Sequence, residues 1–189
     1  MSPLPTLSAE EIATGRLLLR KARDADRDGL VELFTDPEVR AHLGGPRPRE
    51  EVERFLDAIG TAGATAVPGS YVIADRATDR FLGTLMLDRR PSARPGHLTE
   101  EGEELELSYV LRRGAWGQGF AFEAATAALR AAAAELPDQS VLIVTQSANE
   151  RSLRLAARLG FRPVGTFEEF GAEQTLGAAR LSAFAGGPR

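Results

Sequence analysis

Hydrophobic and polar positions follow two different periods along this chain. Short apolar runs bounded by Gly, Pro or Asp predict strands, and longer stretches with apolar residues three or four apart predict helices. The predicted strands are 16–20, 71–74, 81–88, 104–111, 141–144, 163–170 and 176–184, and the predicted helices are 24–34, 36–43, 49–59, 119–136 and 149–159. The order strand, helix, strand between residues 104 and 144 predicts a right-handed parallel crossover with antiparallel strands at either side. The predicted class is α/β with a mixed sheet.

Two helix starts carry their own signals. Asp24 is placed to cap the first helix, because an Asp side chain accepts hydrogen bonds from the free amides of a first turn. Asp36 followed by Pro37 is a second start, with the cap followed by Pro at the first helical position. We therefore expect a short helix to follow Asp36 and to stop before Gly44-Gly45-Pro46.

The turn Trp116-Gly117-Gln118-Gly119-Phe120-Ala121 joins a predicted strand to the Ala-rich helix. A strand–turn–helix of this kind aims backbone N–H groups and a helix N-terminus at one point, where a phosphate binds well. Glycine permits the positive φ of the turn and the close approach of a phosphate oxygen. Residues 117–121 thus predict a phosphorylated cofactor, and the alternative is a plain turn with incidental glycines.

Two nucleotide-binding motifs fail at named positions of this turn. Gly114 and Gly119 have the spacing of a P-loop, but Phe120 and Ala121 stand where Lys and Ser or Thr are needed. The dinucleotide fingerprint would place its third small residue at Phe122. A nucleotide-binding regulatory domain is disfavoured for this reason.

Composition excludes several further classes. The 189 residues fit one domain, and a net charge of −4 argues against a nucleic-acid binder. There is no Cys, and His42 and His97 are the only imidazoles, so we expect no metal site. His42 is expected to be structural. The first residues do not form a signal peptide, and no uncharged run approaches the roughly 20 residues of a membrane span, so a cytoplasmic protein without membrane contact is expected.

Five segments in order resemble the GNAT superfamily of acyl-CoA N-acyltransferases, and most closely its branch with the N-terminal acetyltransferases RimJ and RimL. They are TGRLLLR (14–20), DPEV (36–39), ELSYVL (106–111), WGQGFAFEA (116–124) and NERSLRLAARLGFRPVG (149–165). The resemblance covers about residues 12–184, which leaves an N-terminal extension at 1–11 and a tail at 185–189. It implies a single GNAT-type domain whose central sheet splays at the cofactor site and is flanked by helices.

The resemblance implies that acetyl-CoA is the cofactor. The family loop Q/R-x-x-G-x-G/A, which holds the pyrophosphate, matches Trp116, Gly119 and Ala121, with Trp replacing Gln or Arg. The cofactor-binding residues expected in this loop are Trp116, Gly117, Gln118, Gly119, Phe120 and Ala121. Pantetheine is expected to pair with the backbone around Val110 and Leu111, where the strand leaves its neighbour, because its amides can satisfy unpaired groups there. The N–H near Val110 would polarise the thioester carbonyl.

Asn149 and Ser152 match the N-x-x-S that opens the next helix of the family. The resemblance implies that Asn149 contacts pantetheine and that Ser152 protonates the departing thiolate. A purely structural alternative is that Asn149 only caps the helix and that Ser152 is a first-turn residue facing solvent. Arg158 replaces a common Lys of the family and is equally well a solvated helix residue.

Glu106 is the candidate general base. A protonated amine is a poor nucleophile, and a lysine side chain has a pKa of about 10.4. Glu104, Glu106, Ser108 and Val110 alternate onto one strand face, and Glu106 aligns with the acidic residue of the family. Glu104 is the next candidate, and the other acids of 100–104 are expected to solvate a loop. Tyr109 points to the opposite face and is expected in the core.

The expected reaction is direct transfer of an acetyl group from acetyl-CoA to a primary amine, in a ternary complex, by a monomer or homodimer. The acceptor is a protein or peptide N-terminus or a small molecule. It is expected between residues 34–48 and 167–175, where Glu168, Glu169 and Glu173 would suit a cationic amine unless they are only surface acids. The alternative function is a non-catalytic acyl-CoA sensor or interaction module. Because Glu106 and Ser152 are both present, the enzyme is favoured.

Overall fold

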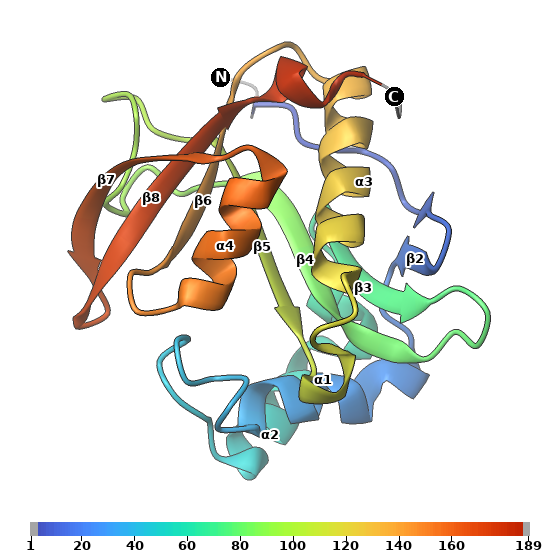
Figure 1. The fold of residues 1–189 in the computed structure, drawn as a ribbon. Helices are drawn as coiled ribbons and strands as arrows, with labels where there is room; N and C mark the ends of the chain where they lie inside the picture. Colours follow the sequence, from blue (N-terminus) through green and yellow to red (C-terminus); the bar gives the residue numbers. More distant parts are fainter. Residues whose placement is uncertain (1–3, 187–189) are drawn as a thin grey trace.

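The computed structural model describes residues 4–186, which form one mixed sheet of eight strands with helices on both faces (Figure 1). The strands are β1 Ile12–Ala13, β2 Leu17–Arg20, β3 Ser70–Asp75, β4 Phe81–Arg89, β5 Leu105–Leu111, β6 Ser140–Gln146, β7 Arg162–Glu169 and β8 Ala172–Arg180. The α-helices are α1 Arg27–Thr35, α2 Arg49–Ile59, α3 Phe120–Glu135 and α4 Glu150–Leu159. Short 3₁₀ turns are η1 Asp24–Asp26, η2 Thr61–Thr65, η3 Arg113–Ala115 and η4 Leu181–Phe184.

The sheet order is β1-β2-β3-β4-β5-β6-β8-β7, and β5 and β6 form its parallel pair. These two strands are in register at Leu105–Val141 and Glu106–Leu142, although β5 continues to Leu111 and β6 to Gln146. Beyond Glu106 the pairing stops, and Figure 1 shows that the far ends of the two strands lie apart. The predicted mixed sheet is confirmed, and it is splayed at the point that the resemblance implied.

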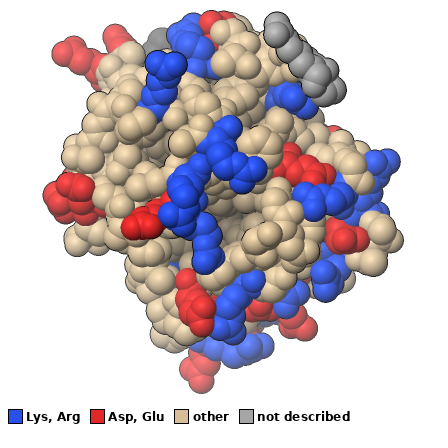
Figure 2. Space-filling model, viewed as in Figure 1, with Lys and Arg blue, Asp and Glu red and all other residues tan. Residues whose placement is uncertain are grey.

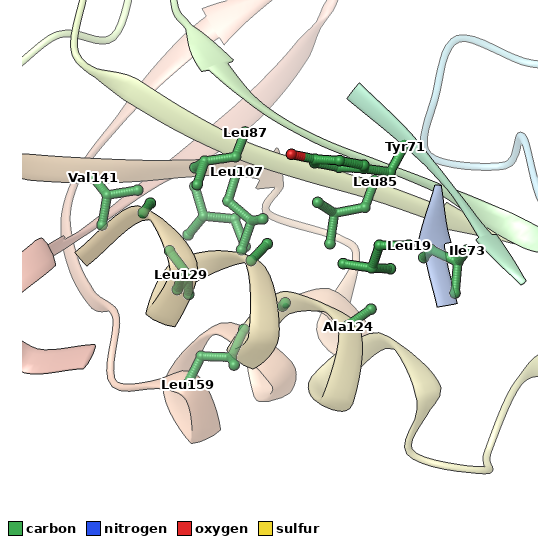
Figure 3. Close-up of a cluster of buried hydrophobic side chains, with 14 of the residues drawn as sticks. Leu19, Tyr71, Ile73, Leu85, Leu87, Leu107, Ala124, Leu129, Val141 and Leu159 are labelled. Atoms are coloured by element: carbon green, nitrogen blue, oxygen red, sulfur yellow. The ribbon is translucent and has the colours of Figure 1, made fainter. Parts of the chain in front are cut away.

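Helix α3 covers one face of the sheet through small side chains. Ala124, Ala128 and Ala132 are fully buried on it, so the helix axis lies close to the strands. Leu85, Leu87 and Leu107 meet this face of α3, as Figure 3 shows. The opposite face is covered by α1 and α2, which pack on the sheet in a second apolar cluster. A ligand entering between β5 and β6 can therefore reach both layers.

The helix expected at 36–43 does not form. Asp36 does act as a cap, since its Oδ1 accepts from the amides of Glu38 at 2.8 Å and Val39 at 3.2 Å. The segment then continues as successive turns and ends at Gly44 and Gly45, which both have positive φ. So short a segment gains few hydrogen bonds for the cost of nucleating a helix.

The first helix starts later than its predicted cap. Asp24 lies inside η1, and α1 begins at Arg27 after Asp26. Asp26 is instead buried in an ion pair with Arg20, and its Oδ2 also accepts from the amide of Arg23 at 2.7 Å. This buried pair ties the start of α1 to β2.

The last strand also differs from its predicted bounds of 176–184. β8 begins at Ala172 and ends at Arg180, because the hairpin turn consists of only Phe170 and Gly171, both with positive φ. A two-residue turn of this kind matches the twist of the strands and lets pairing resume at once. Residues Leu181–Phe184 form η4.

Candidate active site

The divergence of β5 and β6 opens a cleft with a volume of about 1100 Å³. It is lined by residues 107–111 of β5, 143–145 of β6, 115–117 and 119–122 around the start of α3, and the first turns of α4, whereas Gln118 does not line it. Figure 2 shows basic side chains gathered beside this hollow, over α4. Almost all residues that the sequence nominated for the cofactor lie along the cleft.

The glycine turn presents a row of free amides to the cleft. Gly117 and Gly119 have φ of +73° and +78°, as the sequence argument required. Among residues 4–186, no acceptor meets the N–H groups of residues 117–122. These amides lie at the N-terminus of α3, which carries partial positive charge. The arrangement is suited to bind a phosphate or diphosphate.

Two side chains hold this turn in place. The indole N–H of Trp116 donates to the carbonyl of Leu111 at 2.9 Å, which fixes the turn to the end of β5. Arg16 of the segment before β2 donates to the carbonyl of Gln118 at 2.8 Å and pairs with Glu123 of α3 at 2.7 Å. Trp116 therefore contributes positioning as well as a wall of the cleft.

The pairing of β5 with β4 shows which backbone N–H groups face the opening. The amide of Arg112 donates to Leu82 and that of Arg90 to Glu104, so the even-numbered residues of β5 direct their N–H and C=O groups to β4. The N–H groups that face the opening are consequently those of Tyr109 and Leu111. Val110 still lines the cleft with its side chain. The N–H near Val110 that the resemblance implies as a donor is therefore that of Tyr109 or Leu111.

The start of α4 brings Asn149, Ser152 and Tyr109 together. The Oδ1 of Asn149 accepts from the amide of Ser152 at 3.2 Å, which confirms the capping role. The Tyr109 hydroxyl donates to Ser152 Oγ at 3.3 Å. The ring of Tyr109 does pack on the core as expected, but its hydroxyl belongs to the cleft. Burial raises the pKa of Tyr109, and the hydrogen bond to Ser152 only partly offsets this, so the phenol keeps its proton.

Three arginines of α4 line the cleft, of which the sequence analysis singled out only Arg158. Arg151, Arg154 and Arg158 are exposed at spacings of three and four residues, which place them on one helix face. The guanidinium of Arg151 lies 4.3 Å from the centre of the Trp116 ring, and that of Arg158 lies 4.8 Å from the ring of Phe122. These contacts hold positive charge next to the amide row. The spacing of the three arginines was visible in the sequence.

Glu106 lies at the closed end of the splay and not among the residues that line the cleft. Its Oε2 accepts from the buried guanidinium of Arg90 at 2.8 Å. Ser108, one step along the same strand face, does line the cleft, about 7 Å away by the rise of a strand. Among the described residues, no partner meets Glu106 Oε1. The structure therefore leaves one oxygen of Glu106 free to hold a water.

Glu104 is bound into a loop and does not suit the role of a base. It accepts from the amides of Leu98 and Thr99 and contacts Nδ1 of His97. Burial raises the pKa of Glu104, but the hydrogen bonds from His97 and these amides outweigh it and leave the pKa below its ordinary value. The carboxylate of Glu104 therefore holds the loop before β5 in place.

The acids expected to attract a cationic acceptor are not grouped at the cleft. Glu169 is nine-tenths buried and paired with Arg94 at 2.8 Å and with Arg90 at 3.3 Å. Glu168 and Glu173 are exposed on the β7–β8 hairpin. His42, expected to be structural, lines the cleft with its Nδ1 3.3 Å from Gln146 Oε1. In the part of the chain that the structure describes, no three His, Asp or Glu side chains are placed to hold a metal, and no helix is long and apolar enough to cross a bilayer.

Comparison with known proteins agrees with this geometry. The family model of the acetyltransferase (GNAT) domain matches residues 16–162. An uncharacterized N-acetyltransferase of Bacillus licheniformis, p20, is 26% identical over 164 residues, which cover 85% of this chain and 87% of the relative.

Two solved structures show the same fold at low identity. One is spermidine N-acetyltransferase from Vibrio cholerae in complex with CoA and spermine, with a TM-score of 0.68 at 16% identity. The match covers 92% of this chain and 100% of the Vibrio chain. The Salmonella typhimurium acetyl transferase that modifies the N-terminal serine of ribosomal protein L7/L12 has a TM-score of 0.66 at 17% identity, covering 90% and 98%. Since the family model spans most of the chain and the sheet is splayed in the same place that its motifs implied, the chain belongs to the GNAT acetyltransferase family.

Proposed function

We propose that this protein is an N-acetyltransferase that transfers an acetyl group from acetyl-CoA to a primary amine. The observation that carries the proposal is the row of free amides at residues 117–122, placed at the mouth of a cleft between two diverging strands. A diphosphate satisfies such amides, and a chain of amides such as pantetheine satisfies the free edges of the strands. The capped helix α4 with Ser152 closes the other side.

The residues present fit this cofactor. A Cβ built at Gly117 meets nothing within 4 Å, so the amide row is open to a ligand. Arg151, Arg154 and Arg158 add positive charge along the same wall, which suits the phosphates of a nucleotide. Acetyl-CoA would supply an activated acetyl thioester at the inner end of the cleft. There the N–H groups of Tyr109 and Leu111 face the opening and can stabilise negative charge on a carbonyl oxygen.

We assign the two proton transfers to Glu106 and Ser152. Glu106 would accept the proton of the amine through water held on its free Oε1, while Arg90 keeps the carboxylate oriented. Ser152 would provide its hydroxyl proton to the departing thiolate. The Tyr109 hydroxyl, 3.3 Å away, orients Ser152 Oγ and can restore its proton.

Ser152→Ala is expected to lower kcat by about tenfold to a hundredfold, at the low end for a general acid. The loss is limited because the N-terminus of α4 also stabilises a thiolate nearby. Steady-state kinetics with saturating acetyl-CoA measure the effect, and Ser147→Ala, at the start of the same connection but outside the cleft, is the matched control. A Ser152→Ala enzyme with wild-type kcat over the whole pH range would leave Ser152 a first-turn residue only.

The alternative function is an acyl-CoA sensor without turnover. Release of free thiol from acetyl-CoA, measured with a panel of amino acids, peptide N-termini, polyamines and aminoglycosides, separates the two. An enzyme releases thiol in the presence of its acceptor and not in its absence. A sensor binds acetyl-CoA but releases no thiol with any amine.

We also propose that the chain falls in the branch that resembles RimJ and RimL, on the strength of the five segments and their order. The branch does not fix the acceptor. The two structural neighbours described above act on a polyamine and on a protein N-terminus respectively, with nearly the same likeness to this chain. The acceptor has to be inferred from the pocket that receives it.

A further inference from the structure

A second pocket, with a volume of about 300 Å³, lies on the face of the sheet that α1 and α2 cover. It shares Ser108, Tyr109 and Val110 with the cofactor cleft, so the two cavities meet at β5. Its floor consists of two rows of residues in register on neighbouring strands, Ser70–Met86–Ser108 and Thr84–Val110. This position is where an acceptor would meet the acetyl group.

The walls of this pocket are apolar side chains left open to solvent. Phe55, Ile59 and Met86 are between 40% and 48% exposed, and all three line it together with Leu33 and Phe34. Large apolar side chains gathered in a concave site mark a place where a ligand buries an apolar group. The acceptor thus has an apolar body.

The charge in this pocket is positive. Among the described residues, no Asp or Glu lines it, and Arg40 is its charged residue. The guanidiniums of Arg40 and Arg47 both lie 5.7 Å from the ring centre of Phe34, and neither is paired with a carboxylate in residues 4–186. Burial, with the charge of Arg47, lowers the pKa of Arg40, which agrees with a cation lacking a counter-ion.

Three acids of the two helices that cover the pocket are already paired. Glu32 of α1 pairs with Arg112, Asp57 of α2 with Arg27, and Glu53 with Arg49. A polyamine, which carries further ammonium groups beside the one that reacts, would find no free carboxylate on the pocket wall. A carboxylate on the acceptor would instead pair with Arg40.

Arg40 also lies close enough to the cofactor cleft to bind a group near the reacting amine. It stands in the loop whose neighbours Val39 and Ala41 line the cofactor cleft, while Arg40 itself lines the second pocket. The loop is held by Arg40 itself, whose guanidinium donates to the carbonyls of Gly45 and Leu43. The volume suits one small molecule at the lower end of the usual range.

We propose that the acceptor is a small amine with an apolar body and a nearby carboxylate, of which hydrophobic amino acids are the simplest members. The carboxylate pairs with Arg40, and the apolar side chain lies between α1, α2 and Met86. The amine then points to Ser108, where the cavities join. This inference rests on the proposed acetyl transfer, and it excludes polyamines as the preferred acceptors.

The test compares an acceptor that has a carboxylate, one that lacks it and one that carries further ammonium groups. Thiol release from acetyl-CoA is measured with L-phenylalanine, with L-phenylalaninamide, which has the same shape but no carboxylate, and with spermidine. We expect kcat/KM for L-phenylalanine to exceed that for L-phenylalaninamide by at least about tenfold, as for one charged hydrogen-bonded pair, and to exceed that for spermidine further. A kcat/KM for either competitor that equals or exceeds that for L-phenylalanine would overturn the inference.

Two variants locate the effect in the pocket. Arg40→Gln is expected to lower the phenylalanine-to-phenylalaninamide ratio of kcat/KM by about tenfold. Ile59→Glu places an acid on the exposed rim without touching the loop at 36–48, and it should lower the same ratio. Arg54→Gln, an exposed arginine of α2 outside both cavities, is the matched control and should keep the wild-type ratio. Unchanged ratios in both pocket variants would contradict the proposal.

Calorimetry with CoA distinguishes a failure of the proposed function from a failure of the proposed acceptor class. A protein that does not bind CoA contradicts the proposed function itself. A protein that binds CoA and acetylates spermidine or a peptide in preference contradicts only the acceptor class. If CoA binds but no amine is acetylated, a thermal shift with N-acetyl-L-phenylalanine and CoA together decides, and no added stabilisation over CoA alone overturns the proposal.

Discussion

Glu106→Gln is expected to lower kcat by about 10² to 10⁴-fold, with little change in affinity for acetyl-CoA. The amide keeps the shape of the side chain and can still accept from Arg90, but it cannot take a proton from the amine. The carboxylate lies outside the cleft wall, one same-face step from Ser108, so the cofactor does not contact it. The measurement is steady-state kinetics together with a CoA titration.

Two control measurements accompany the Glu106→Gln variant. Glu101→Gln, an exposed acid of the preceding loop, should keep wild-type kcat, which separates the effect from a general loss of negative charge. The unfolding temperature of Glu106→Gln should be recorded, because Arg90 is fully buried and loses one of its two carboxylate partners. A folded Glu106→Gln protein with wild-type kcat at neutral pH would remove Glu106 from the mechanism, and Asp88, which is opposite it on β4, would be next.

Gly119→Val is expected to weaken binding of CoA at least about tenfold, because it disturbs the amides that a diphosphate needs. Gly119 has φ of +78°, which a β-branched residue adopts only with strain. The new side chain would also stand 3.5 Å from the Arg16 guanidinium that holds the carbonyl of Gln118. Calorimetry measures the affinity, and a circular-dichroism melt shows whether the fold persists.

Gly114→Ala is the matched control for this change. Gly114 precedes the amide row, and a Cβ there meets nothing within 4 Å. Its affinity for CoA should equal that of the wild type. Equal affinity in a folded Gly119→Val protein would show that the phosphates are not bound at residues 117–122.

The mixed sheet and its splay were predictable because they depend on local signals. Gly117 and Gly119 stand at a strand-to-helix turn that only glycine makes easily, and Pro137 and Gly160 end the two helices that follow. The helix expected after Asp36 failed because the segment is short and because a contact from beyond it competes. The amide of Arg47 donates to the carbonyl of Phe34, so tertiary contacts draw this loop across the pocket instead of leaving it helical.

The direction of backbone groups was harder to predict than the identity of the strand. Alternation correctly put Glu106 and Val110 on one face, but which residues pair with β4 depends on register, which a single strand does not reveal. The same holds for Tyr109, whose ring is in the core while its hydroxyl reaches Ser152 on another element. Glu169 was a plausible partner for a cation until Arg90 and Arg94 were found to occupy it.

A crystal structure of the protein with CoA would locate the cofactor. We expect that the diphosphate oxygens accept from amides of residues 117–122, and that pantetheine follows the edge of β5 along Tyr109 and Leu111. The sulfur should then lie within hydrogen-bonding reach of Ser152 Oγ, directly or through one water. CoA bound outside the β5–β6 cleft, or phosphates that make no contact with these amides, would show that this cleft is not the cofactor site.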